Sequence, residues 1–191
     1  KYGQRHQREI LSAINVCKSL NVSEHRIIEL DLRCFGASAL TADFEIPKKQ
    51  IPGEGGIPIT YVPARNTIFL SLALAFAESE NAHSIFIGVS SVDYSGYPDC
   101  RPEFIKSFEY MANLGTRAAD NEEKFQIFTP VMKLSKSETV LLGKQLGVDF
   151  SLTWSCYDPT EEGKPCRECD SCILRAKGFW DAGLDDPLIK N

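Results

Sequence analysis

Apolar residues recur along the chain with two periods, one typical of helices and the other typical of strands. Spacings of three and four residues predict helices over 7–20, 66–80, 102–114 and 135–146. Shorter apolar runs predict strands over 27–32, 84–89 and 125–129. The run S-I-F-I-G-V at 84–89 is apolar at almost every position, as in strands that helices cover on both faces. Strands that alternate with helices predict an α/β domain with a parallel sheet.

Local signals mark several of these boundaries. Pro102 suits the first turn of a helix, because its missing N–H has no partner there in any case. Ser135 and Glu138 have the spacing of a capping box, and Gly147 is placed to end that helix. The stretch 38–58 is rich in Pro and Gly and predicts irregular structure.

Length and composition limit the class of protein. The 191 residues predict a single domain, with an α/β part over 1–150 and a C-terminal segment over 151–191. A net charge of −5 disfavours direct binding to nucleic acid. The longest apolar run, Thr67–Ala77, is too short to span a bilayer, so we expect no membrane association. Seven cysteines with no visible targeting segment favour the reducing cytoplasm.

The spacing of four of these cysteines carries most of the chemical information. Cys166, Cys169 and Cys172 follow one another in C-R-E-C-D-S-C, and Cys156 lies upstream across a polar, turn-rich loop. Two-residue gaps let neighbouring thiolates turn toward one ion, and Zn²⁺ prefers four such ligands in a tetrahedron. The spacing predicts a closed, structural zinc site. An iron–sulfur cluster and disulfide bonds are the alternatives, although iron–sulfur runs usually place the fourth cysteine downstream.

Polar segments follow the predicted strands, where parallel sheets bind ligands. Arg65 and Asn66 precede the apolar helix, with Asn66 as its expected N-cap. Lys136 falls in the first turn of another helix, where a cation is unfavourable unless it serves an anionic ligand. The loop after the strand at 84–89 offers carboxylates, tyrosines and an arginine, of which the candidates are Asp93, Tyr94, Asp99 and Arg101. The alternative at each place is a surface charge or an ordinary turn.

Five stretches together resemble the 7-cyano-7-deazaguanine synthase family, QueC, of the ATP pyrophosphatase superfamily. They are Y-G-Q-R-H at 2–6, V-P-A-R-N at 62–66, G-V-S-S-V-D-Y-S-G-Y-P-D-C-R at 88–101, T-P-V-M-K-L-S-K-S-E at 129–138, and the cysteine array followed by L-R-A-K-G. The resemblance covers nearly the whole chain. It implies a Rossmann-like fold of the adenine-nucleotide α-hydrolase type.

The resemblance also implies an activity. The family is an ATP-dependent ligase that converts 7-carboxy-7-deazaguanine and ammonia to 7-cyano-7-deazaguanine, on the route to queuosine or archaeosine in tRNA. ATP with Mg²⁺ and a structural Zn²⁺ are the implied cofactors, and small molecules are the partners, with a homodimer as in many relatives. The candidates above would hold ATP or substrate, with Asp93, Tyr94 and Asp99 reading the deazaguanine. No residue of the sequence is assigned as catalytic.

The sequence departs from the family pattern in two ways. The family's S-G-G-x-D-S phosphate loop and its preceding strand would lie upstream of Tyr2, so the chain as given would lack its main nucleotide anchor and would be inactive. Ala64 stands where many relatives have glycine, which matters if that position needs a positive φ. A tRNA-sulfurating or NAD-forming relative and a zinc-ribbon module that binds RNA are the competing functions.

Overall fold

The computed structural model describes residues 1–49, 56–91 and 96–189, which fall into two compact units. The first unit is built from described residues within Lys1–Glu54, Ile59–Val62 and Lys136–Asn191. The second is built from those within Gly55–Pro58 and Pro63–Ser135. The single domain that the length suggests stays a prediction.

The second unit contains a short parallel sheet, as predicted. Strand β1 (Ser84–Phe86) pairs with β2 (Gln126–Phe128), with Ile85 opposite Ile127. Both strands lie inside the predicted runs and are shorter than them. Phe86 and Phe128 stack on one face, with ring centroids 4.8 Å apart, and Phe86 remains 68% exposed. The expectation of a strand buried on both faces is therefore wrong for Phe86.

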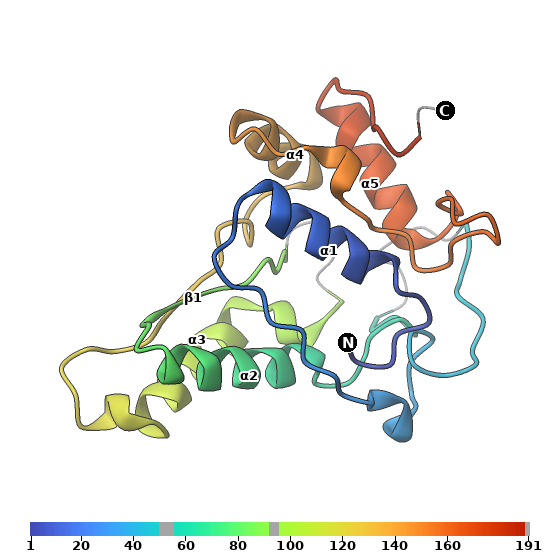
Figure 1. The fold of residues 1–191 in the computed structure, drawn as a ribbon. Helices are drawn as coiled ribbons and strands as arrows, with labels where there is room; N and C mark the ends of the chain where they lie inside the picture. Colours follow the sequence, from blue (N-terminus) through green and yellow to red (C-terminus); the bar gives the residue numbers. More distant parts are fainter. Residues whose placement is uncertain (50–55, 92–95, 190–191) are drawn as a thin grey trace. The chain divides into compact units, whose positions relative to one another are not determined.

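Two helices cover the other face of this sheet (Figure 1). Helix α2 (Arg65–Ser79) and helix α3 (Pro102–Leu114) match their predicted ranges within a residue, and Pro102 occupies the first turn. Their apolar sides meet Ile85 in one contiguous core, whose central residues are Leu70, Leu74, Phe108, Ala112 and Phe125. Complete burial of such a side chain contributes about 1.5–3 kcal/mol, so this core is the main source of stability in the second unit.

In the described part of the first unit there are three helices and two short 3₁₀ turns. They are α1 (Arg8–Ser19), η1 (Leu32–Phe35), α4 (Lys136–Gln145), η4 (Phe150–Leu152) and α5 (Asp170–Asp181). Helix α1 was predicted from its apolar spacing, yet Ile10, Ile14 and Cys17 are only half-buried and Leu20 is exposed. Gly147 has φ 74° just beyond α4, as its predicted role at the helix end requires.

The predicted strand at 27–32 is not formed. Its backbone is nonetheless bonded to the start of the chain: Lys1 donates to the Ile28 carbonyl at 2.7 Å, and Leu30 donates to that of Lys1 at 2.8 Å. Ile27 and Ile28 are close to half exposed. Among the described residues, the start of the chain offers this segment only a short pairing partner, and the segment is little buried. Apolar composition alone therefore does not produce a strand here.

Helix α4 packs closely on α5 because of a glycine. A Cβ atom added at Gly178 of α5 would lie 2.7 Å from the Cβ of Lys136, at the start of α4. Gly143 of α4 similarly leaves room for the ring of Phe150, which packs edge-on against Phe179 of α5. The absence of side chains at these two positions is what lets the helices approach.

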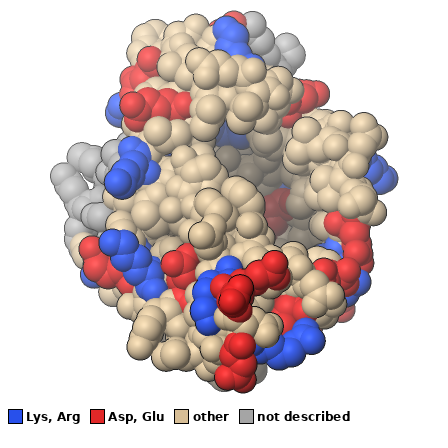
Figure 2. Space-filling view, turned by 90° about the vertical axis from the view of Figure 1, so that its left-hand side faces the viewer, with Lys and Arg blue, Asp and Glu red and all other residues tan. Residues whose placement is uncertain are grey.

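Charged side chains of both signs are interspersed on the face that Figure 2 presents. This mixture agrees with the small net charge of −5. Among the helices that the structure describes, none combines the length and the apolar character needed to cross a membrane.

We predict that Gly178→Val separates α4 from α5. The added isopropyl group has no space against Lys136, and overpacking of this kind lowers the free energy of unfolding by about 2 kcal/mol. Ala176→Val, on the same helix but facing a pocket, is the control and should cost about 0.5 kcal/mol. Urea denaturation measures both, and equal losses would contradict the close packing at Gly178.

Candidate metal centre and ligand-binding residues

The four predicted cysteines meet at the start of helix α5. The sulfur atoms of Cys156, Cys166, Cys169 and Cys172 all lie within 4.8 Å of one another. Cys169 is the N-cap of α5 and Cys172 lies in its first turn, so the helix itself sets the spacing of these two thiols. A tetrahedron with Zn–S bonds of about 2.3 Å has edges of about 3.8 Å, close to the 4.0 Å between the sulfurs of Cys166 and Cys172.

The surrounding backbone donates to these sulfurs. The Cys166 N–H lies 3.2 Å from the Cys156 sulfur, the Asp158 N–H lies 3.4 Å from the same atom, and the Cys169 N–H lies 3.4 Å from the Cys166 sulfur. Such bonds stabilise thiolates, which are the form that binds a metal. Cys156, Cys169 and Cys172 are buried, so water has little access to the centre. An all-sulfur, enclosed donor set fits a structural Zn²⁺ and leaves no open coordination position.

Hydrogen bonds among the thiols give them different pKa values. A hydrogen bond with Cys169 raises the pKa of Cys156 to about 12, and its counterpart from Cys156 holds the pKa of Cys169 well below the ordinary value. Hydrogen bonds, first with Cys156 and then with Cys169, raise the pKa of Cys172. One thiolate is thus stabilised by protonated neighbours, and a bound cation would replace those protons.

A buried ion pair, which sequence reasoning missed, supports the centre. Arg175 of α5 donates to both carboxylate oxygens of Asp186, at 2.8 and 2.9 Å, and Asp186 is 7% exposed. The same guanidinium donates to Thr153 Oγ1 at 2.8 Å and to the Phe150 carbonyl at 3.3 Å. It therefore joins α5 to the segment that leads into Cys156. Its place in the L-R-A-K-G run beside the cysteines was the available signal.

Two of the predicted ligand-binding residues bind each other in the second unit. Asn66 was expected to cap α2, but Ala64 is the N-cap, with φ 54°, and Asn66 lies inside the helix. The Asn66 N–H donates to Asp99 Oδ2 at 3.0 Å, and its Nδ2 donates to the Asp99 carbonyl at 3.1 Å. Asp99 is the group that satisfies this end of α2, because its carboxylate accepts from a helical N–H from outside the helix.

The predicted basic candidates occupy helix starts. Arg65 is the first residue of α2 and is half-buried, and Arg101 is the exposed N-cap of α3. Lys136 is the first residue of α4, as its sequence position predicted, and belongs to the first unit. Asp93 and Tyr94 lie outside the described residues. The ligand-binding roles of all these residues stay predictions.

One hydroxyl beyond strand β1 was not singled out from the sequence. The Ser90 Oγ is buried and has no hydrogen-bond partner among the described residues. Its neighbour Ser91 is fixed, since both its N–H and its Oγ lie within 3.1 Å of the Met132 carbonyl. The carboxyl end of the sheet therefore presents a buried polar group, which normally requires a partner. The two serines after an apolar strand in G-V-S-S were the signal that could have found it.

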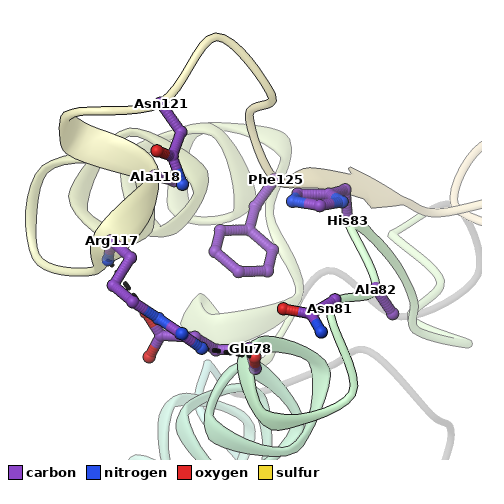
Figure 3. A pocket seen from close by; sticks show the side chains of 8 residues that line it. All are labelled: Glu78, Asn81, Ala82, His83, Arg117, Ala118, Asn121 and Phe125. Carbon is purple, nitrogen blue, oxygen red and sulfur yellow. Dashed lines mark hydrogen bonds and ion pairs between the residues drawn. The ribbon is translucent and has the colours of Figure 1, made fainter.

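A pocket lies at the opposite, amino end of the strands (Figure 3). His83 directly precedes β1 and Phe125 directly precedes β2. The charged groups there already have partners: Arg117 donates to the Glu78 carboxylate and carbonyl, and His83 lies 3.5 Å from Glu123. This pocket is separate from the sheet edge where ligands are expected.

These features define the class of the protein: a Rossmann-like α/β fold with a parallel sheet and a C-terminal cluster of four cysteines that could hold zinc. The profile of one family, described as queuosine biosynthesis protein QueC, matches residues 1–183. The chain belongs to this family.

Curated relatives agree with this assignment. A protein of Paramagnetospirillum magneticum is 56% identical over 98% of this chain and 83% of its own length. One from Desulfatibacillum aliphaticivorans is 56% identical over 97% of this chain and 81% of its own length. One from Geobacter sp. strain M21 is 54% identical over 98% of this chain and 82% of its own length. Each of these relatives is named 7-cyano-7-deazaguanine synthase.

We predict that the chain binds one zinc ion and that Cys169→Ser loses it. A hydroxyl replaces one of four thiolates in a buried centre, and binding of a structural metal is coupled to folding. Elemental analysis should give close to one zinc per chain for the parent and much less for the variant. Cys34→Ser, at an exposed cysteine away from the cluster, should keep its zinc. Iron in place of zinc, or no metal in the parent, would overturn the assignment.

We predict that Arg175→Met strongly destabilises the first unit. The variant keeps much of the apolar volume but leaves the buried Asp186 carboxylate without its cation, at a cost of about 3–5 kcal/mol. Lys177→Met is the control at an exposed position of the same helix. It removes an exposed pair with Asp181 and should cost about 0.5 kcal/mol or less. Thermal denaturation of the two variants decides whether the ion pair has this role.

Proposed function

We propose that the protein to which this chain belongs is an ATP-dependent ligase that makes 7-cyano-7-deazaguanine from 7-carboxy-7-deazaguanine and ammonia. The observation that carries the proposal is the extent of the similarity: relatives of that name are 54–56% identical over 97–98% of the chain. The clustering of Cys156, Cys166, Cys169 and Cys172 supports it, because the resemblance implies a zinc site at these positions.

The chemistry explains the need for ATP. A carboxylate is a poor electrophile, since its leaving group would be oxide. Transfer of AMP from ATP to the carboxylate releases pyrophosphate and gives a mixed anhydride. Ammonia then displaces AMP and forms the amide. A second adenylation, at the amide oxygen, allows AMP to leave together with that oxygen, and loss of the N–H protons gives the nitrile.

The residues of the second unit would serve the base and its carboxylate. Asp99 is held at the start of α2, where an anion is favoured, and can accept from the donor edge of a guanine-like ring. Asp93 and Tyr94, which lie outside the described residues, would also read the base. Arg101 would meet the substrate carboxylate, and the Ser90 hydroxyl is available as a further donor.

The two candidate side chains that remain to be assigned are cations, and both would bind phosphate. Arg65 and Lys136 are first residues of α2 and α4, where N–H groups and the helix dipole favour anions. Mg²⁺ would accompany ATP, and Zn²⁺ would hold the C-terminal segment without taking part in the chemistry. The partners would be small molecules, without direct contact with nucleic acid or membrane. We expect a cytoplasmic enzyme that forms a homodimer.

We predict that Lys136→Ala and Arg65→Ala weaken the use of ATP. Loss of a charge that meets a phosphate in a partly desolvated site should reduce kcat/KM for ATP about tenfold or more. Lys144→Ala, in the last turn of the same helix as Lys136, is the matched control and should retain activity. The assay, run on the full-length enzyme, follows AMP release and the mass of the product, with zinc content measured in parallel.

Two outcomes separate the parts of this proposal. A parent protein that releases AMP but yields no nitrile from 7-carboxy-7-deazaguanine would refute the substrate. Normal kcat/KM in both alanine variants would not contradict the proposed reaction. It would refute the assignment of Arg65 and Lys136 as phosphate-binding residues.

A further inference from the structure

A short segment far upstream in the sequence lies against the cysteine loop. Lys48 and Cys169 form an isolated antiparallel bridge, and the Lys49 N–H donates to the Glu168 carbonyl at 2.8 Å. Ile46 is 6% exposed, so the segment is also anchored by an apolar side chain. We call residues 46–49 the strap. The strap is joined by its backbone to one of the four cysteines themselves.

The two adjacent lysines of the strap have different surroundings. The Lys48 ammonium lies 2.9 Å from Asp158 Oδ2, and the N–H of Asp158 donates to the Cys156 sulfur. Hydrogen bonding to Asp158, followed by the charge on that residue and on Cys166, raises the pKa of Lys48. The Lys49 ammonium instead lies 3.0 Å from Glu168 and is 77% exposed. The Lys48 side chain is 44% exposed and ends at Asp158, whose N–H donates to a cluster sulfur, whereas Lys49 ends at Glu168 and is more exposed.

The different surroundings of the two lysines matter for the charge balance of the metal centre. Four thiolates around Zn²⁺ carry a net charge of −2, which a buried site tolerates only with compensation. The Asp158 carboxylate, which accepts from Lys48, lies beside the cluster, and the Asp170 Oδ1 is enclosed without a partner among the described residues. Arg175 is already engaged by Asp186. Lys48 pairs with Asp158, and so it brings a positive charge from the strap to the residue whose N–H donates to the Cys156 sulfur.

We propose that Lys48 is a positioning residue of the metal centre, and that the strap is held against the cysteine loop through the metal-loaded cluster. The inference rests on the metal site proposed above and goes beyond it. It assigns a role to a segment that the cysteine spacing does not include. Metal binding would then fix the strap as well as the C-terminal segment.

Competition for zinc with a chromophoric chelator tests the role of Lys48 in the full chain. Lys48→Met should bind zinc about tenfold more weakly than the parent, the usual size of an effect from a group that supports metal ligands. Lys49→Met removes an equal charge one residue away and should stay within about twofold of the parent. Lys48→Arg keeps the charge and should restore most of the affinity. Equal affinities for Lys48→Met and Lys49→Met would overturn the proposal.

Amide hydrogen exchange gives a second readout that does not depend on activity. In the zinc-loaded parent the Lys49 amide should be protected by its bond to Glu168, and this protection should fall about tenfold in Lys48→Met at equal zinc occupancy. Peptides from α3 serve as the internal control, since that helix belongs to the second unit. Unchanged protection of the Lys49 amide would refute the proposal that the strap is held against the cysteine loop through the metal-loaded cluster. A parent that binds no zinc would instead refute the metal site on which the inference depends.

Discussion

The meeting of four cysteine sulfurs at the start of helix α5 is the constraint on which the first unit depends. The contiguous apolar core lies in the second unit, where α2, α3 and the sheet share buried side chains. Helix α1 of the first unit buries no residue completely. Where apolar burial is limited, cross-links take over its role, as small domains with metals or disulfides illustrate. In this unit the buried Arg175–Asp186 pair is one such link, and a metal held by the four sulfurs would be another.

Helix α5 transmits this constraint to the rest of the unit. Its N-terminus is set by Cys169 and Cys172, its middle holds the segment before Cys156 through Arg175, and Gly178 fixes the start of α4. Lys136, the proposed phosphate-binding residue, is the first residue of α4 and packs directly on that glycine. A metal held by the four cysteines would therefore be linked, through α5 and Gly178, to the position of Lys136.

The sequence predicted the elements whose signals are local. Helix spacing, Pro102 at a first turn and Gly147 at a helix end all depend on neighbouring residues, and the four helices they marked are formed within two residues of the expected bounds. The cysteine cluster was predictable because two-residue gaps leave few other arrangements. Signals that depend on distant partners failed: residues 27–32 have apolar strand character but little burial, and the cap of α2 is supplied by Asp99 rather than by Asn66. Nothing in a linear pattern could place Asp186 under Arg175 or bring Lys48 to Cys169.

The bond between Asn66 and Asp99 gives two of the candidate residues a structural role toward each other. Both side chains are buried, and the amide of Asn66 also reaches the Cys100 sulfur at 3.3 Å. Asp99 uses one carboxylate oxygen to accept from the α2 backbone, which fixes the orientation of the carboxylate and leaves the other oxygen with acceptor capacity. A carboxylate held in this way loses little rotational freedom when it meets a base with a donor edge. The bonds between Asn66 and Asp99 thus join two segments of the second unit that are far apart in sequence.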